Sequence, residues 1–146
     1  MRITRFTDYS LRVLIYLAAQ EDGRLSTIQE IADSYDISKN HLMKVVHQLN
    51  QKGYIATVRG KNGGMRLYRD PQDINIGALV RETEEELSIV ECFSRDNACK
   101  ITPACSLRGM FGEALQAFLC VLDKYTLAEV VQSKHRPELL RLLQVM

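Results

Sequence analysis

The chain has 146 residues, of which 46% are hydrophobic and 25% are charged, and this is the ordinary composition of a folded globular domain. Its longest uncharged apolar stretch, residues 13–19, is far shorter than the roughly 20 residues that a membrane-spanning helix needs. The N-terminal residues lack the apolar segment of a secretory signal, so we expect a cytoplasmic protein whose four cysteines serve metal binding or redox chemistry rather than a disulfide framework.

The formal net charge of +1 hides an uneven distribution. Residues 1–70 carry 11 Lys and Arg against 7 Asp and Glu, whereas residues 71–146 carry 8 against 11. The segment 37–69 contains no acidic residue and seven basic ones, which are Lys39, Lys44, Lys52, Arg59, Lys61, Arg66 and Arg69. Such a segment suits the backbone of a nucleic acid, and a solvated basic face is the alternative interpretation.

Three helices are predicted in the N-terminal third of the chain. The first is expected over about residues 8–20, with Thr7 as its N-cap. The second follows Thr27, which can form a capping box with Glu30. The third follows Ser38 and ends near Gly53, and its apolar stripe consists of Leu42, Val45, Val46 and Leu49.

The second and third helices, joined by a tight turn, are typical of a helix-turn-helix motif. On the face opposite its apolar stripe, the third helix carries Asn40, Lys44, His47 and Gln51. Amide, ammonium and imidazole groups suit base edges and phosphates. The periodicity alone would also fit any amphipathic surface helix.

A β-hairpin is predicted after the third helix. Two β-prone runs, 54–58 and 65–68, flank the glycine-rich, cationic segment 59–64. The glycines allow the tip to approach a DNA groove closely, although such tips often do nothing except turn the chain. A helix-turn-helix followed by a basic hairpin is a winged helix, and this favours DNA binding.

The remaining helices are predicted beyond Pro71. One spans about 76–86 with Asn75 as its cap and ends in the acidic run 82–86, which is predicted to be a solvated face. A long helix is expected from Thr102 to about residue 124. Its apolar seam consists of Leu107, Phe111, Ala114, Phe118 and Val121. A second apolar row lies beside this seam, and the two together form a stripe wider than one small domain can cover. This predicts a homodimer.

A short helix capped by Thr126 and an apolar helical tail over 137–146 complete the chain. The expected fold is therefore mainly α with a small β-hairpin: a winged helix-turn-helix plus a long dimerisation helix. We expect a DNA-binding region over 1–70, a connecting helix and cysteine loop over 71–101, and the dimerisation and C-terminal helices over 102–146.

Three cysteines, Cys92, Cys99 and Cys105, are separated by six and then five residues in a predicted loop. Three thiols this close together indicate one metal centre. Their spacing lacks the Cys-x-x-Cys pairs of structural zinc sites, and it favours an iron–sulfur cluster over zinc, with unligated thiols as a third possibility. Cys120 lies among apolar residues and is predicted to be a core residue.

Over essentially its whole length the chain resembles the dimeric iron–sulfur winged-helix repressors. The matching segments are MRITRFTDYSLR (1–12), ISKNHL (37–42), VRGKNGGMRL (58–67), the three cysteines and LDKYTLAEV (122–130). The segments RGKNGG (59–64) and ITPAC (101–105) resemble the nitric-oxide-sensing members of this family most closely.

The resemblance implies a homodimer that binds palindromic operators in double-stranded DNA. The third helix would occupy the major groove and the wing the minor groove. The residues expected to contact DNA are Ser38, Lys39, Asn40, His41 and Lys44 in the helix and Arg59, Lys61, Asn62, Gly63 and Arg66 in the wing.

The resemblance also implies one iron–sulfur cluster per subunit on Cys92, Cys99 and Cys105, with Asp8 of the partner subunit as the fourth ligand. A 4Fe–4S cluster is expected ahead of a 2Fe–2S cluster. Another branch of the family uses a histidine three residues after the last cysteine, where this chain has Arg108. Asp8 also suits a purely structural role, since an acid in the first turn complements the helix dipole.

The expected function is a non-enzymatic repressor that releases its operator when nitric oxide modifies or removes the cluster. A regulator of the same fold that senses iron supply or redox state is the alternative. A zinc- or thiol-based redox protein is a third possibility. It is disfavoured because the sequence has no Cys-x-x-Cys pair and no histidine beside a cysteine.

Overall fold

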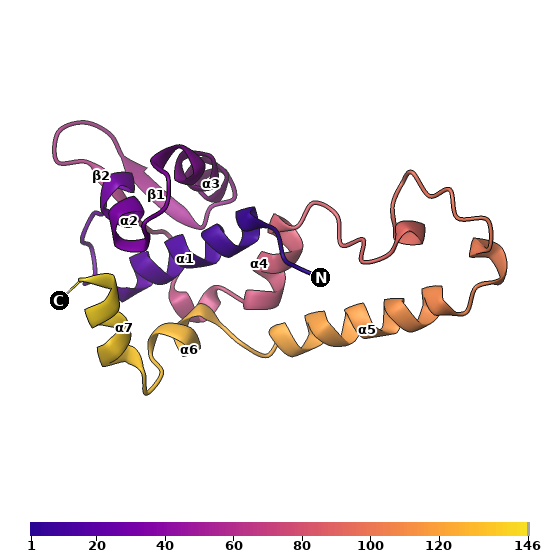
Figure 1. Cartoon of the computed structure of the whole chain (residues 1–146). Helices are drawn as coiled ribbons and strands as arrows, with labels where there is room; N and C mark the ends of the chain where they lie inside the picture. The colour runs from indigo at the N-terminus through magenta and orange to yellow at the C-terminus, as the bar shows by residue number, and fades with distance from the viewer. Residues whose placement is uncertain (146) are drawn as a thin grey trace.

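The computed structural model describes residues 1–145 as a winged-helix unit from which a long arm projects (Figure 1). The helices and strands are α1 (Arg5–Ala19), α2 (Ile28–Tyr35), α3 (Lys39–Gln51), β1 (Ile55–Val58), β2 (Gly64–Leu67), α4 (Ile76–Thr83), α5 (Leu107–Leu122), α6 (Leu127–Val131) and α7 (Arg136–Leu143). Short 3-10 turns lie at Pro71–Asp73, Glu91–Phe93 and Thr102–Ala104. The arm consists of α5 and of the segment 84–106, which runs beside it (Figure 1).

Helix α1 begins earlier than the sequence predicts. Its N-cap is Thr4, whose hydroxyl accepts a hydrogen bond from the backbone N–H of Thr7 at 3.2 Å. The prediction of Thr7 as the cap is therefore wrong, because Thr7 is fully buried inside the first turn. The fully buried face of α1 includes Val13 and Leu14, which form the centre of the core.

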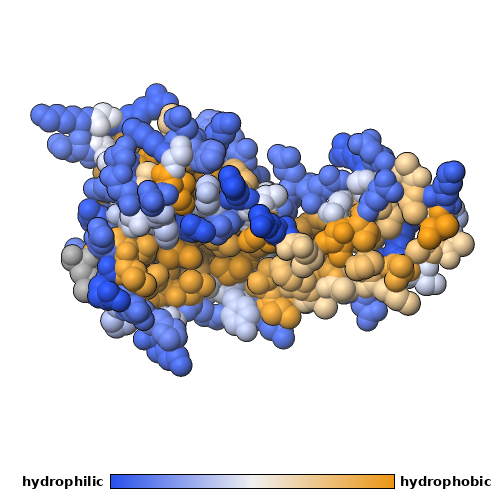
Figure 2. Space-filling view, in the orientation of Figure 1, coloured by the Kyte–Doolittle hydropathy of each residue, from blue (hydrophilic) through white to orange (hydrophobic). Residues whose placement is uncertain are grey.

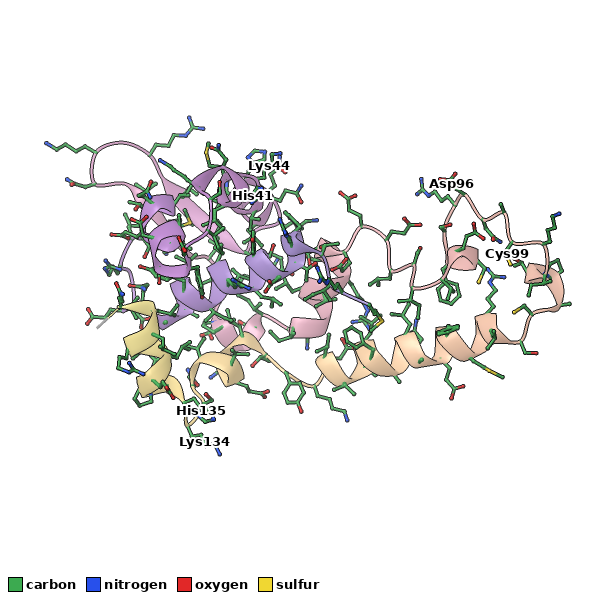
Figure 3. The ribbon with its side chains drawn as sticks, in the orientation of Figure 1. His41, Lys44, Asp96, Cys99, Lys134 and His135 are labelled. Carbon is green, nitrogen blue, oxygen red and sulfur yellow. The ribbon has the colours of Figure 1, made fainter. Side chains whose placement is uncertain are left out.

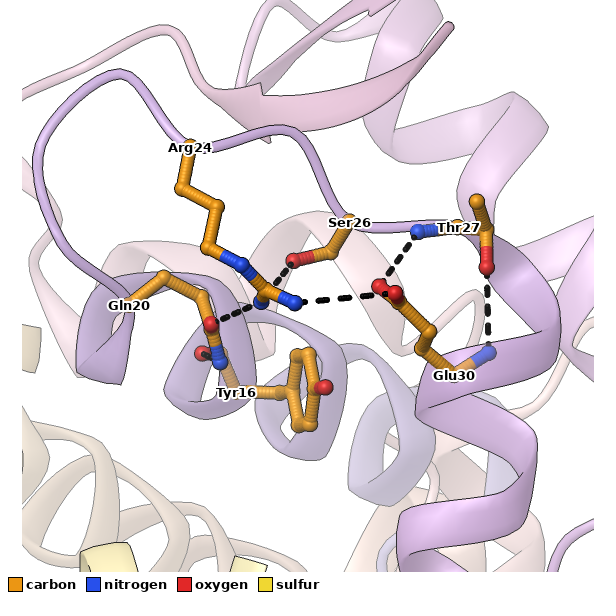
Figure 4. Close-up of polar contacts among 6 residues, drawn as sticks. All are labelled: Tyr16, Gln20, Arg24, Ser26, Thr27 and Glu30. Atoms are coloured by element: carbon orange, nitrogen blue, oxygen red, sulfur yellow. Dashed lines mark hydrogen bonds and ion pairs between the residues drawn. The ribbon is translucent and has the colours of Figure 1, made fainter. Parts of the chain in front are cut away.

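The turn between α1 and α2 is fixed by a polar network (Figure 4). The Arg24 guanidinium donates to the side-chain oxygen of Gln20 and pairs with the Glu30 carboxylate at 3.6 Å. Glu30 also completes the predicted capping box, in which its carboxylate accepts the N–H of Thr27 at 3.0 Å. This network fixes the connection between α1 and the start of α2, the first helix of the helix-turn-helix.

Helix α3 and the hairpin follow the sequence prediction. The predicted apolar stripe of α3 (Leu42, Val45, Val46 and Leu49) is buried. Strands β1 and β2 pair antiparallel, with Ile55 opposite Leu67 and Val58 opposite Gly64. Ser26 extends this sheet, because its N–H and C=O both bond to Met65, at 2.9 and 2.8 Å. The wing is thus joined directly to the helix-turn-helix.

The C-terminal helices return from the arm to the winged-helix unit. Leu127 and Val131 of α6 and Leu143 of α7 are buried in the same core as Val13 and Leu14 of α1. Each fully buried side chain of this size stabilises the fold by roughly 1.5–3 kcal/mol. The predicted tail helix is confirmed over Arg136–Leu143, and residue 146 lies outside the described residues.

Helix α4 begins as predicted, with the Asn75 side chain accepting from the N–H of Ala78 at 2.9 Å. It ends at Thr83, three residues before the predicted end. The prediction that 82–86 is a solvated face is wrong for Thr83 and Glu84, which are buried, whereas Glu82, Glu85 and Glu86 are exposed. Exposed Glu82 also accepts a hydrogen bond from the buried Tyr54.

Helix α5 begins at Leu107 rather than at Thr102. Thr102 and Pro103 lie instead in a separate 3-10 turn, where the hydroxyl of Thr102 bonds back to the carbonyl of Cys99 at 2.8 Å. Leu119 is the one buried residue that the structure records on this helix. No helix within residues 1–145 is long and apolar enough to cross a membrane.

Candidate DNA interface and cysteine loop

The N-terminal half of α3 presents a polar face to solvent. All five residues predicted to contact DNA in this region are exposed, and these are Ser38, Lys39, Asn40, His41 and Lys44. His41 and Lys44 lie at the outer surface of the winged-helix unit (Figure 3). Because the opposite face of α3 is buried in the core, this face is the one that a DNA groove can reach.

The wing places four further predicted contacts in solvent: Arg59, Lys61, Asn62 and Arg66. Gly63 is partly buried, and a Cβ atom there would lie 2.2 Å from the carbonyl oxygen of Val58. A side chain therefore cannot fit at Gly63 without opening the turn. The structure brings the recognition helix and the wing together on one winged-helix unit that is basic and free of acidic residues from 37 to 69.

Met43 also lies on the exposed side of α3, with half of its surface accessible to solvent. Met43 is absent from the predicted DNA contacts, because an apolar residue on a helix is normally assigned to the core. Its position next to Leu42 and Lys44, outside the apolar spacing, is the signal that could have identified it.

The cysteine loop, residues 88–105, lies on the arm. Cys92 and Cys105 are partly buried, Cys99 is exposed, and all are free thiols. Figure 3 shows Cys99 beside the far end of α5, well away from His41 and Lys44. Among residues 1–145 the structure gathers no three His, Cys, Asp or Glu side chains into a metal-binding group. The three predicted cysteine ligands therefore share one loop without converging.

The donor chemistry of this loop fits an iron–sulfur cluster. Thiolate sulfur is the ligand that such clusters take, and none of these thiols is committed to a disulfide. The hydrogen bonds described for residues 90–105 all join two residues of that same segment, as in the bond from the Cys99 N–H to the Asn97 side chain at 3.0 Å. Local bonding of this kind lets the loop rearrange around a bound group with little disruption elsewhere.

Asp8 lies in the first turn of α1, and its carboxylate is paired with Arg12. The two hydrogen bonds measure 2.9 and 3.2 Å, and both side chains are about 40% exposed. The Arg12 guanidinium also lies over the rings of Tyr9 and Tyr35, at 5.5 and 5.9 Å from their centroids. Burial raises the pKa of the Tyr35 hydroxyl, which donates to the carbonyl of Arg12 at 2.8 Å.

The predicted dimer seam lies open along α5. Leu107, Phe111, Ala114, Phe118 and Val121 are all exposed. An open groove of about 690 Å³ runs between this helix, the end of α4 and the N-terminal residues, and Phe111, Ala114 and Phe118 line it. Figure 2 shows a continuous hydrophobic surface that extends from the winged-helix unit along the arm.

Cys120 is on the exposed side of α5. The prediction that it is a core residue is therefore wrong for the single chain. Its apolar neighbours in the sequence belong to the exposed seam rather than to a buried core, and an apolar stripe has the same pattern in both cases.

Comparison with known proteins gives consistent matches. The profile of the Rrf2 family, described as an iron-dependent transcriptional regulator, matches residues 3–133. The chain is 54% identical over 146 residues to the HTH-type transcriptional regulator NsrR of Bacillus subtilis. The aligned region covers 99% of each of the two chains.

Solved structures give the same fold. The oxidised form of CymR from Staphylococcus aureus superposes with a TM-score of 0.72 and 26% identity, over 91% of this chain and 98% of that one. IscR of T. potens superposes with a TM-score of 0.70 and 23% identity, over 90% of this chain and 87% of that one. The predicted winged-helix fold is thereby confirmed.

Proposed function

Because this chain belongs to the Rrf2 family and is a DNA-binding transcriptional regulator of the NsrR type, we propose that it is a homodimeric repressor whose iron–sulfur cluster senses nitric oxide. The observation that carries the proposal is the pairing of two surfaces in one chain. One is the exposed basic face of α3 and the wing, and the other is the loop of three free thiols on the arm.

The DNA contact uses the residues already placed on that face. Lys39, Lys44 and Lys61 neutralise phosphates, and Asn40 offers a bidentate amide to a base edge in the major groove. Two copies related by a two-fold axis would present two such faces to a palindromic operator. The exposed seam on α5 supports this arrangement, because in a dimer it would be withdrawn from water.

Cys92, Cys99 and Cys105 would hold one cluster per subunit, and Asp8 of the partner subunit would complete its ligands. A bound cluster would supply iron with which nitric oxide can react as the signal. A carboxylate would be a harder and weaker ligand for such iron than a thiolate, so the iron held by Asp8 would be the one most open to nitric oxide. To act as a ligand, Asp8 must leave the guanidinium of Arg12, 2.9 Å away in the single chain.

Anaerobic purification followed by iron, sulfide and zinc analysis tests the cluster. We expect a brown protein whose iron and sulfide fall to background in Cys92→Ala, Cys99→Ala and Cys105→Ala. Cys120→Ala is the matched control and keeps its cluster, since its thiol lies on α5 outside the loop. A colourless protein with one zinc per chain would contradict the proposal.

The signal is tested on the loaded protein with a duplex selected from a randomised library. Nitric oxide should release this duplex at a stoichiometry set by the cluster content. Release by an iron chelator or by oxygen, together with indifference to nitric oxide, would contradict the nitric oxide proposal and favour the regulator of iron supply or redox state.

A further inference from the structure

The last turn of α4 and its C-cap form a junction between the arm and the winged-helix unit. The three consecutive residues Glu82, Thr83 and Glu84 each bond to a different residue of that unit. The chain then passes directly into the segment that carries the cysteines. The prediction of a solvated acidic face over 82–86 does not include this junction.

Glu82 acts on the DNA-reading elements through Tyr54. Tyr54 lies between the end of α3 and the start of β1, is 1% exposed, and donates its hydroxyl to the Glu82 carboxylate at 2.8 Å. The Arg69 guanidinium stacks 4.0 Å from the centroid of the Tyr54 ring. Arg69 also donates to the carbonyls of Lys52 and Gly53, at 2.8 and 3.2 Å. Glu82 thus reaches the C-terminal end of the recognition helix and the base of the wing.

Glu84 and Thr83 act on the N-terminus of α1. The carboxylate of Glu84, which is 8% exposed, accepts the backbone N–H of Thr4 at 2.7 Å. This is the bond that a glutamate three residues after the cap supplies in a capping box, and here Thr7 occupies that position. The hydroxyls of Thr7 and Thr83 are 2.8 Å apart in the core. The negative charge at this end of α1 also complements its dipole.

The other side of α4 is joined to α5. Arg81 pairs with Asp123, the C-cap of α5, with one of its two bonds at 3.0 Å, and this pairing lowers the pKa of the Asp123 carboxyl. Gly77 allows this close approach, since a Cβ atom there would lie 2.9 Å from the backbone nitrogen of Asp123. Helix α4 therefore has bonded neighbours on both the arm and the winged-helix unit.

We propose that Glu82 and Glu84 are positioning residues that transmit the state of the cysteine loop to the recognition helix, the wing and the N-terminus of α1. The inference rests on the proposed function, and adds to it the residues that connect the two surfaces. The loop has only local hydrogen bonds over 90–105, so along the chain toward the N-terminus a change in the loop first meets tertiary hydrogen bonds at 82–84. Both α1 and the end of α3 are held there.

The test compares operator affinity of the loaded and apo forms in matched variants. Glu82→Ala removes the acceptor for Tyr54, and Tyr54→Phe removes only the donor. Glu85→Ala removes the same charge from an exposed neighbour for which no side-chain hydrogen bond or ion pair is described, and is the control. Glu82→Gln keeps an acceptor oxygen and should restore the wild-type behaviour.

We expect Glu82→Ala and Tyr54→Phe each to reduce the ratio of loaded to apo affinity about fivefold, the factor that corresponds to one hydrogen bond of ordinary strength. The double variant should lose no more than either single one. The probe is a duplex selected from a randomised library by the loaded wild-type protein. Tyr54→Phe removes only the hydroxyl oxygen, so the affinity ratio can still be measured in this variant if Glu82→Ala does not fold.

Hydrogen exchange provides a second readout that needs no DNA. The backbone amides of Gly53 and Tyr54 should exchange faster in the apo wild type than in the loaded wild type. In loaded Glu82→Ala they should already exchange at the fast rate, whereas in loaded Glu85→Ala they should exchange as slowly as in the loaded wild type. A wild-type affinity ratio that persists unchanged in Glu82→Ala and Tyr54→Phe would contradict the transmission alone. Equal affinity of the loaded and apo wild type would contradict the proposed function, and the transmission with it.

Discussion

The Asp8 carboxylate is the residue whose role most affects the proposed site. In the single chain it pairs with Arg12 four residues away, and both side chains are about 40% exposed. Exposed pairs of this spacing contribute only about 0.3–0.5 kcal/mol. A structural role for Asp8 therefore predicts a small effect on folding, whereas a role as cluster ligand predicts an effect on the cluster.

Asp8→Asn should change the free energy of unfolding by less than about 1 kcal/mol, because the pair that it breaks is half-exposed. The cluster should still form on the three cysteines but degrade several-fold faster in air and react with nitric oxide at a different rate. Urea unfolding of the apo form and stopped-flow absorbance of the loaded form measure the two effects. Identical spectra and kinetics in Asp8→Asn and wild type would assign Asp8 to the helix dipole alone.

Tyr54 gives the protein a pH dependence in the alkaline range. Burial raises the pKa of its hydroxyl from the usual 10.0 to about 12. The folded state therefore keeps a proton that the unfolded state loses, and this contribution to stability is complete below pH 10 and is lost as the pH rises through about 12.

The free energy of unfolding should accordingly fall less steeply above pH 10 in Tyr54→Phe than in wild type. Denaturant unfolding between pH 8 and pH 12 measures the two slopes. Tyr16 and Tyr35 also have raised pKa values, but they are present in both proteins and cancel in the comparison. Parallel curves would show that the Tyr54 hydroxyl titrates alike in the folded and unfolded states.

At the level of elements, sequence periodicity predicted the features that depend on residues close together in the chain. The features that depend on tertiary contacts could not be predicted in this way. The apolar stripe of α3 and the capping box of α2 depend on residues a few positions apart, and both are confirmed. The start of α1 has a local cap in Thr4, but the bond that completes this cap comes from Glu84, 80 positions away in the chain. The exposure of Cys120 depends on what covers α5, which no local pattern contains. The three cysteines could be selected from their spacing, although the described residues 1–145 do not bring their thiols together.

Helix α3 and the wing should contribute to DNA binding in different ways. Lys61→Ala should weaken binding to all duplexes alike and reduce the salt dependence of affinity by about one phosphate contact. Asn40→Ala should change base preference at one position of each half-site, at a cost of about 1–3 kcal/mol.

Fluorescence anisotropy over a salt series, with selected and scrambled duplexes, separates these effects. Lys134→Ala is the control, since Lys134 is exposed near α7 and far from Lys44 (Figure 3). If Lys61→Ala behaves as Lys134→Ala does at low salt, the wing is not part of the interface.

At the level of the whole molecule, the arm leaves α5 almost without a covering surface. Leu107, Phe111, Phe118 and Val121 are between 36% and 54% exposed. Exposed apolar surface on this scale marks an interaction site. In a symmetric dimer the same seam on each copy would cover the other, and the cysteine loop of each copy would lie on an arm fixed by that contact.

Phe118→Glu should convert the dimer to monomers, because it places a charge within the apolar seam. Gln116→Glu adds the same charge to the opposite face of α5 and should remain dimeric. Sedimentation equilibrium of the two variants at equal concentration measures the difference. A dimeric Phe118→Glu protein would place the subunit contact elsewhere.

The proposed switch requires that a change on the arm alters a DNA-reading surface on the other side of the molecule. A hundredfold difference in affinity needs only about 2.7 kcal/mol of coupling between the two sites, which lies within the usual range for allosteric proteins. The three hydrogen bonds that residues 82–84 make to the winged-helix unit, at about 1 kcal/mol each, together contribute free energy of this order.

The affinity of the loaded, apo and nitric-oxide-treated dimers for one selected duplex, measured at a single salt concentration, tests this switch directly. We predict that the loaded dimer binds about a hundredfold more tightly than the other two forms, while all three remain folded and dimeric. Equal affinity of the loaded and apo dimers would contradict the switch, even in a protein that holds the cluster.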